Sequence, residues 1–372
     1  MHKKKEKIKL ALICPVDFMG GAEFFVLSLL EEISKNHPFW EIYLFCSNHQ
    51  TFLQNISSKI KVIKFDFPRL KKFSLFAIKD FFTTAQKLYQ KIITISPNIV
   101  LSNSIRSHLL TAQALNKTNI KFAFFVHDFT FPGFFLRLFS RQVNKIFTCS
   151  NSVKKDLLIK NKTLKNKITT IYGGVNLPQK NINKTKRTFK NIGIIGRLDP
   201  WKGQDIFIKS AEIILKKNNN LRFFIFGKSS GYDPATKQFE KKLQNIIKEK
   251  KLQKKVFLCG FVEREKALKK IDLLVHASCQ KEPFGKVIIE SLSYGIPIIA
   301  SSLGGSREII KNGYNGFLIN PKNPQLLAKK ILQIISDQKL RKKFIYNGLA
   351  TIKEKFLLSK VTKKLLQNLK QM

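Results

Sequence analysis

The sequence has no apolar stretch long enough to cross a bilayer, because a transmembrane helix needs roughly 20 consecutive apolar residues and every apolar run here is shorter. A basic N-terminus, residues 1–7, precedes the apolar run Ile8–Cys14. That run is too short for the hydrophobic region of a secretion signal and leads directly to a glycine pair, so it is better explained as a buried strand. We therefore expect a cytoplasmic protein.

Cysteine is scarce and scattered. The five cysteines stand far apart, and none forms a Cys-x-x-Cys or Cys/His pattern with the spacing of metal ligands. Cys14, Cys149 and Cys259 each end an apolar, strand-like run, where a thiol usually behaves as a small hydrophobic group. We expect free, reduced cysteines and no bound metal.

Acidic residues are also few: 24 stand against 68 basic ones, which gives a net charge of +44. Lysine dominates the excess, and the chain is rich in Ile, Asn and Phe, as A+T-rich coding tends to produce. Both halves of the chain are basic, so the charge does not form one nucleic-acid-binding stripe. Such a field attracts anionic lipid, at ~1 kcal/mol per lysine near the surface. It equally attracts an acidic acceptor or a nucleotide diphosphate.

The 372 residues exceed what one hydrophobic core usually serves, so two domains are expected. Short apolar runs alternate with helical patterns in both halves, which predicts parallel sheets covered by helices. The predicted strands of the first half are Ile8–Cys14, Trp40–Cys46, Lys61–Phe65, Ile99–Ser102, Phe122–Val126 and, as the last, Phe147–Ser150. Those of the second half are Ile192–Ile195, Arg222–Phe226, Val256–Cys259, Leu273–His276, Ile298–Ala300 and Gly316–Leu318. The predicted fold is α/β, with two doubly wound, Rossmann-like domains facing each other across a cleft.

Composition suggests the domain boundaries. Residues 1–180 form the N-terminal domain, and the polar, lysine-rich stretch 181–190 is the linker. Residues 191–352 form the C-terminal domain. The remaining 353–372 read as a lysine-rich helix, for which two alternatives stay open: it crosses back to the first domain, or it is a solvated tail.

The most informative segment runs from Glu282 to Glu290, with sequence Glu-Pro-Phe-Gly-Lys-Val-Ile-Ile-Glu. A loop with a glycine, Gly285, that opens a helix is an anion site, because the first turn offers free N–H donors and a positive dipole end. Two carboxylates around it suit a ligand that also carries hydroxyls, one on a sugar and one on a ribose. A nucleotide sugar offers that combination.

Two glutamates eight positions apart around Pro-Phe-Gly resemble the signature of the retaining family-4 glycosyltransferases (glycosyltransferases group 1), which have the GT-B fold. Further matching pieces occur in the expected order, and the resemblance covers roughly residues 8 to 345. These pieces are Gly20-Gly21-Ala22-Glu23, His127-Asp128, Gly196-Arg197-Leu198, Lys202-Gly203, and Gly304-Gly305 with Glu308.

The resemblance implies a retaining, hexosyltransferase-type enzyme that uses a nucleotide sugar as substrate and needs no cofactor. It implies that Glu290 holds the donor's ribose, while Glu282 and the N–H groups of Phe284 and Gly285 meet the transferred sugar. Glu282 would also stabilise positive charge at the anomeric centre, and no residue is assigned as a covalent nucleophile. Lys286 departs from the family pattern, which more often has an apolar residue there, and it would add a cation beside the diphosphate.

The chain contains no Asp-x-Asp pair of the kind that holds a metal-bound diphosphate. Side-chain cations would then take the metal's role, and Arg197 and Lys202 are the matching pair. Both follow a predicted strand, and glycines stand on either side of them. Charge-assisted bonds to phosphate oxygens are strong and directional, and they strengthen as charge develops on the leaving group.

Other candidate residues are individually weaker. His127 ends a predicted strand, and the resemblance places it against the donor sugar's hydroxyls, while Asp128 either orients it or caps a turn. Gly20 and Gly21 would let the backbone approach the phosphates, the alternative being a tight turn without a ligand. Val262 is a candidate backbone contact to the base.

Two segments of the first half, Arg69–Phe82 and Phe129–Phe139, mix basic residues with aromatic ones. Basic helices with aromatic anchors lie at membrane surfaces, although an aromatic stripe at helical spacing is more often part of a core. We expect the acceptor to be a cell-envelope glycan or a lipid-linked molecule such as lipopolysaccharide. The enzyme would then work on the inner face of the plasma membrane.

Two other classes of function each fit part of the sequence. A nucleotide-sugar epimerase or a phosphorylase could share the fold, but the cofactor-lysine signal of a phosphorylase is not recognisable and the glutamate pair favours transfer. The charge suggests a nucleic-acid-binding protein, yet the sequence has no zinc module, helix-turn-helix or RNA-binding aromatic signature.

Overall fold

The computed structural model describes residues 7–17, 19–68, 75–131, 133–139, 142–178, 188–230 and 233–372. The chain divides into two compact units, Met1–Gly174 with Leu358–Met372, and Val175–Leu357. The predicted linker, residues 181–190, lies outside the described residues except for 188–190. The first boundary falls at Gly174 rather than near residue 180. Its physical basis is that the Val175 N–H donates to the Phe356 carbonyl at 2.9 Å, which ties residue 175 to the second unit.

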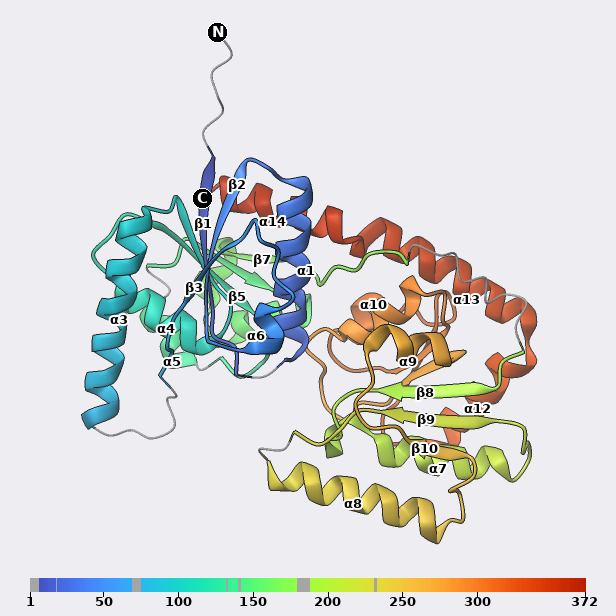
Figure 1. Cartoon of the computed structure of the whole chain (residues 1–372). Helices are drawn as coiled ribbons and strands as arrows, with labels where there is room; N and C mark the ends of the chain where they lie inside the picture. Colours follow the sequence, from blue (N-terminus) through green and yellow to red (C-terminus); the bar gives the residue numbers. More distant parts are fainter. Residues whose placement is uncertain are drawn as a thin grey trace. The chain divides into compact units, whose positions relative to one another are not determined.

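The first unit is built on a parallel sheet of seven strands in the order β3-β2-β1-β4-β5-β6-β7 (Figure 1). The central strands are buried, as is typical of a parallel sheet covered on both faces. The bounds are β1 Ile8–Cys14, β2 Trp40–Cys46, β3 Lys61–Lys64, β4 Ile99–Ser102, β5 Lys121–Val126, β6 Lys145–Thr148 and β7 Ile168–Thr170.

The strand predicted to be the last of this unit is wrong in two respects: where it ends and its place as the final strand. The expected final strand, Phe147–Ser150, is β6, which stops at Thr148. The Ser150 hydroxyl accepts a hydrogen bond from the Val153 N–H and so begins a helix. A further strand, β7, follows that helix and forms the edge of the sheet.

Helices flank this sheet, and their sequences carry the expected apolar periodicity. The longest of them, Leu75–Ile95, is one continuous helix of 21 residues. The helices are α1 Gly21–Asn36, α2 Gln50–Leu53, α3 Leu75–Ile95, α4 Ile105–Ala114, α5 Gly133–Phe139, α6 Asn151–Lys160 and α14 Leu358–Lys370.

The last helix, α14, belongs to the first unit. It packs against α1 (Figure 1), and the Lys364 Nζ donates to the Thr170 carbonyl at 3.1 Å. Leu365 and Leu369 are among six residues that α14 buries, so it is not a solvated tail. The helix starts at Leu358 rather than at residue 353, because Ile352–Phe356 form a π-helical turn and Leu357 is extended.

The second unit contains a parallel sheet of six strands in the order β10-β9-β8-β11-β12-β13. The strands are β8 Asn191–Ile195, β9 Arg222–Phe226, β10 Val256–Leu258, β11 Leu273–His276, β12 Ile298–Ser301 and β13 Phe317–Ile319. The helical segments are η3 Pro200–Lys202, α7 Gln204–Leu215, α8 Pro234–Glu249, α9 Arg264–Lys270, α10 Lys286–Ser293, α11 Ser306–Ile309, α12 Pro324–Ser336 and α13 Gln338–Thr351.

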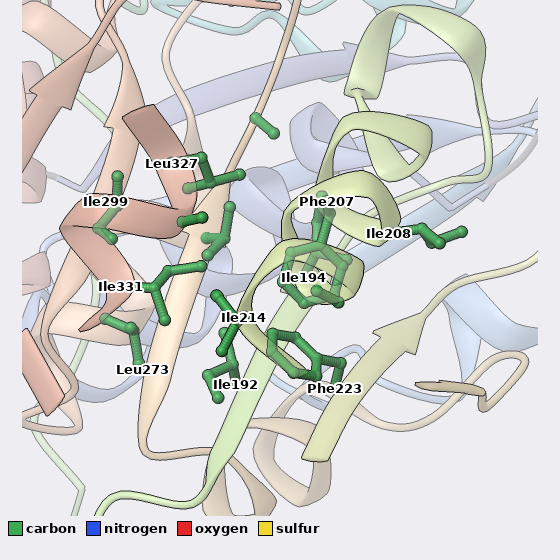
Figure 2. Packing of buried hydrophobic residues seen from close by; sticks show 14 of the residues in the cluster. Ile192, Ile194, Phe207, Ile208, Ile214, Phe223, Leu273, Ile299, Leu327 and Ile331 are labelled. Atoms are coloured by element: carbon green, nitrogen blue, oxygen red, sulfur yellow. The ribbon is translucent and has the colours of Figure 1, made fainter. Parts of the chain in front are cut away.

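A buried apolar cluster holds α7 and α12 against this sheet. Figure 2 shows Phe207 and Ile214 of α7 near Ile192 of β8, with Ile331 of α12 close by. Burying a side chain of this kind contributes about 1.5–3 kcal/mol. The cluster therefore holds the strands of the sheet in place, and with them the loops that follow the strands.

The strand order reverses between β8 and β11, which makes this pair the topological switch point of the second unit. Ligands of open parallel sheets bind outside the carboxyl ends of the strands at such a point. The loops concerned are residues 196–203, after β8, and 277–285, after β11. In the first unit the reversal falls between β1 and β4.

No disulfide joins any of the five cysteines, all of which lie among the described residues. No helix in the described part of the chain is both long and apolar enough to pass through a membrane.

Candidate functional site

The two loops at the switch point of the second unit are joined by an ion pair. Lys202, at the end of η3, places its Nζ 2.7 Å from Oε2 of Glu282. Both side chains are largely buried. The Lys202 Nζ also lies 3.9 Å from the centroid of the Trp201 ring, a cation–π arrangement. Two residues predicted from separate motifs are thus in contact.

Gly203 makes this approach possible. It has φ of +74°, and a Cβ at this position would lie 2.2 Å from the carbonyl oxygen of Ala277. A side chain would therefore push the loop after β8 away from the loop after β11. The glycine next to Lys202 is required for backbone clearance as well as for its left-handed conformation.

Two further groups, those of Ser278 and His276, converge on the Glu282 carboxylate, and neither was predicted from the sequence. The Ser278 hydroxyl donates to Oε2 at 3.1 Å, and the His276 Nε2 lies 3.3 Å from the same oxygen. Both residues stand at or just after the end of β11. The signal that singled out His127, a polar residue ending an apolar strand, was present here too.

These neighbours keep Glu282 ionised. Burial alone raises the pKa of its carboxyl group, because the charged form loses hydration. The opposing effects of the Lys202 ammonium and of His276 are together larger, so the pKa of Glu282 lies well below its usual range. The structure therefore holds a buried negative charge at the switch point.

The predicted glycine pair, Gly304 and Gly305, supports the backbone of the Glu282 loop. The Gly305 N–H donates to the Glu282 carbonyl at 2.8 Å. A Cβ on Gly304 would lie 2.2 Å from that carbonyl oxygen, and one on Gly305 would lie 2.6 Å from the Cα of Phe284. Larger residues would displace the loop, so this pair serves to position Glu282.

Phe284 and Gly285 follow in the same loop. The Phe284 ring is buried, with its centroid 6.0 Å from that of Phe356, so the side chain belongs to the packing of the second unit. Gly285 has φ of +92° and begins α10. The role predicted for the N–H groups of these two residues, as donors to a ligand at a helix start, stays a prediction.

Glu290 forms a second acidic centre on α10. The Arg264 Nε lies 3.2 Å from Oε2 of Glu290, and the Lys286 Nζ lies 3.9 Å from Oε1. Burial lowers the pKa of Lys286 below its usual value and outweighs the opposing effect of Glu290. Arg264 comes from α9, and no local sequence pattern indicated that it would meet Glu290.

The other predicted residues of the second unit are less engaged. Arg197 does not share a partner with Lys202: its guanidinium pairs with Asp199 at 2.9 Å and its side chain is 45% exposed. Val262 is half-buried in the loop between β10 and α9. Arg197 thus lies in the loop after β8, as predicted, with its charge shared with Asp199.

In the first unit, His127 directly follows β5 and its Nε2 lies 2.8 Å from Oδ1 of Asn103, which follows β4. The ring stacks on Phe125 with centroids 4.4 Å apart. Burial lowers the pKa of His127 to about 4, so the ring is neutral at physiological pH. Asp128 accepts hydrogen bonds from the Thr130 N–H and hydroxyl, which identifies it as a turn cap.

Gly20 and Gly21 lie at the start of α1. The Gly20 N–H donates to Oε2 of Glu23 at 2.9 Å, so this donor already caps the helix. A Cβ on Gly21 would meet no atom within 4 Å among the described residues. Gly21 therefore leaves open space at the helix start, while the Gly20 N–H is already satisfied within the chain.

Two family models match consecutive parts of the chain. The model described as Glycosyltransferase Family 4 matches residues 19–179. The model described as Glycosyl transferases group 1 matches residues 176–351, which include the whole Glu282 cluster. The pair of matches thus extends from residue 19 to residue 351.

Among curated proteins, the chain is similar to the poly(ribitol-phosphate) alpha-N-acetylglucosaminyltransferase of Staphylococcus aureus. The identity is 32% over 186 residues, which are 50% of this chain and 36% of that protein. The chain spans about half the length of the curated relatives it matches. For two further relatives, the match covers 58% and 56% of the relative's own length.

Among solved structures, Anabaena HepE in complex with UDP and glucose matches with a TM-score of 0.80 and 20% identity, covering 98% of this chain and 100% of that one. The apo form of the lipopolysaccharide outer core galactosyltransferase WaaB matches with a TM-score of 0.70 and 20% identity, covering 97% and 99%. At this identity the likeness establishes the fold, which is GT-B.

Substituting Gly203 by Ala is expected to destabilise the protein by about 3 kcal/mol or more, because a left-handed backbone costs ~1–2 kcal/mol and the backbone clash adds to it. Gly260→Ala is the matched control, since Gly260 has φ of +63° and a Cβ there would meet no described atom within 4 Å. Urea unfolding measures both. If both variants lost the same free energy of unfolding, the close approach of Gly203 to Ala277 would not matter for stability.

Glu282→Gln is expected to lower the free energy of unfolding at neutral pH. The pKa of Glu282 is lower in the folded protein than in the unfolded chain, so its ionisation stabilises the fold above the unfolded pKa, ~4.3. This stabilisation is lost as the pH falls through the folded pKa. The difference between wild type and variant should therefore narrow on acidification below about pH 4. A difference that stays constant from pH 7 to the acid limit of folding would refute the ion pair's contribution.

Proposed function

Because this chain belongs to the group 1 and family-4 glycosyltransferases, we propose that it moves a hexosyl residue from a nucleotide sugar to a hydroxyl of an acceptor. The transfer proceeds with retention at the anomeric carbon and without a metal ion. The observation that carries the proposal is the buried Lys202–Glu282 pair at a switch point, with Glu290 eight residues further along the chain.

In this proposal the cations of the second unit take the charge of the leaving diphosphate. The bond between the anomeric carbon and the diphosphate oxygen breaks, and its electron pair leaves with the diphosphate. The acceptor oxygen bonds to the same carbon and its proton passes to the departing phosphate or to water. Lys202 and Arg197 turn from their carboxylate partners, Glu282 and Asp199, toward the diphosphate and stabilise its developing negative charge. The start of α10 adds the N–H groups of Phe284 and Gly285.

The carboxylates have separate roles. Glu282 accepts a hydroxyl of the transferred sugar and, being ionised, stabilises positive charge at the anomeric centre. Glu290 accepts the ribose hydroxyls, with Arg264 and Lys286 balancing its charge. In the first unit, His127 is neutral and is our candidate for a hydrogen bond to a hydroxyl of the ligand. Uridine diphosphate sugars are the first donors to test, because HepE was solved with UDP and glucose.

The acceptor we propose is an acidic glycan or a lipid-linked molecule of the cell envelope. The net charge of +44 favours an anionic partner. One relative is named for poly(ribitol phosphate), an acidic polymer, and one structural neighbour for the lipopolysaccharide outer core. Lipopolysaccharide is therefore one acceptor class that suits the charge.

We also propose that the first unit rests on an anionic membrane surface through α5 and α6, which pack against each other. Phe134 on α5 is 72% exposed and Ile159 on α6 is 81% exposed. Arg137 and Lys155 are exposed one helical turn from them, three and four residues away. Apolar anchors beside cations are what an anionic bilayer interface binds.

Lys202→Ala and Glu290→Ala are each expected to weaken donor binding at least about tenfold, since each removes a charge-assisted contact worth ~1.5–3 kcal/mol. A thermal-shift screen with UDP, GDP and ADP sugars identifies the donor, because a ligand of the native state raises its apparent stability. Lys248→Ala, on the exposed side of α8, is the control and should keep wild-type affinity. Wild-type donor affinity in both site variants would refute the site, and chelator-sensitive turnover would refute metal independence.

The membrane proposal predicts that Phe134→Ser combined with Ile159→Ser reduces vesicle binding at least about tenfold. The reason is that the double variant has less apolar side-chain area to bury in the bilayer interface. Co-sedimentation uses phosphatidylglycerol mixed with phosphatidylcholine, and phosphatidylcholine alone. Tyr346→Ser, equally exposed at 76% but in the second unit, should leave binding unchanged. Equal sedimentation of all three proteins, or no dependence on phosphatidylglycerol, would contradict the proposal.

A further inference from the structure

The Glu282 carboxylate is held unevenly. Lys202, Ser278 and His276 all approach one oxygen, Oε2, at 2.7, 3.1 and 3.3 Å. In the part of the chain that the structure describes, no donor is placed on Oε1. An ionised carboxylate has about four lone-pair sites shared between its two oxygens. The protein therefore saturates one oxygen and leaves the other to accept a hydrogen bond from a ligand.

His276 is the least explained of the three donors. It ends β11 and is only 6% exposed. Its Nδ1 is buried and has no hydrogen-bond partner within the described residues. A buried N–H without an acceptor costs about 1–3 kcal/mol, and placing the proton on Nδ1 would also set the Nε2 lone pair against a carboxylate. The favoured tautomer carries its proton on Nε2, directed at Glu282.

The three donors differ in what a bound diphosphate does to them. Lys202 is a cation, and a diphosphate beside it competes with Glu282 for its charge. His276 and Ser278 approach Oε2 from at or just after the end of β11 on side chains shorter than lysine, so they follow the diphosphate less readily. They can keep hold of Oε2 when Lys202 turns toward the leaving group.

We infer that His276 is a positioning residue, whose Nε2–H fixes Oε2 of Glu282 so that Oε1 faces a hydroxyl of the transferred sugar. This inference rests on the proposed function, in which Glu282 meets that sugar. It concerns the sugar and not the nucleotide, since the His276 ring reaches the ligand only through Glu282. Loss of His276 should therefore affect nucleotide sugars and spare the free nucleoside diphosphate.

The test compares His276→Gln, whose side-chain N–H can replace the imidazole Nε2–H, with His276→Leu, which has no donor. Calorimetry measures the Kd of UDP and of UDP-glucose, and UDP release from UDP-glucose with water as acceptor measures turnover. His276→Leu should keep the Kd of UDP within about twofold of wild type. Its turnover should fall about 10- to 100-fold, because the variant loses one hydrogen bond to a charged group. His276→Gln should stay within about threefold of wild type.

Three results would overturn the inference: wild-type turnover in His276→Leu, equal losses in the Gln and Leu variants, or a UDP Kd that weakens as much as turnover. Far-UV circular dichroism establishes that both variants fold. A wild type that binds neither UDP nor any sugar nucleotide of the screen would instead refute the proposed function.

A second measurement needs no donor. A long-range proton–nitrogen NMR spectrum of the ligand-free protein reports the tautomer of each histidine, and the His276→Gln spectrum identifies the signal of His276. The inference predicts the Nε2–H tautomer. An Nδ1–H tautomer would overturn it, whatever the donor proves to be.

Discussion

The ion pair between Lys202 and Glu282 is the interaction on which the second unit's site depends. It joins two loops whose residues are 80 positions apart in sequence, each following a strand at the switch point of the sheet. A carboxylate buried this far would be costly if unpaired. The ammonium, with the hydroxyl of Ser278 and the imidazole of His276, makes the charge tolerable and fixes its orientation.

The glycines around this pair are explained by backbone clearance. Gly203 lies against Ala277, and Gly304 and Gly305 lie against Glu282 and Phe284, with no space for a Cβ at any of the three. These contacts bring three loops of one sheet close together, so that the side chains of Lys202 and Ser278 reach Glu282. The motifs of the sequence thus divide into residues that present charge and residues that allow the charges to approach.

The sequence predicted the sheets well, because strands of a covered parallel sheet are continuous apolar runs. Trp40–Cys46 and Leu273–His276 are strands over the predicted ranges. The edge strand Ile168–Thr170 was missed because two of its three residues are threonines, so it forms no apolar run, unlike the equally short β10 and β13. Glu282 and Lys202 were identified from their motifs. The contact of Arg264 with Glu290 joins two helices that the sequence does not relate, so only the fold could reveal it.

A double-mutant cycle on Lys202→Met and Glu282→Gln tests the central claim most directly, because it isolates the coupling between the two side chains from the other effects of each substitution. The free energy of unfolding is measured at neutral pH for the wild type, both single variants and the double variant. A buried, hydrogen-bonded pair predicts a coupling of about 1–3 kcal/mol, with the double variant more stable than the sum of the single losses implies. Losses that simply add would contradict the account, since Lys202 and Glu282 would then be neighbours that do not stabilise each other.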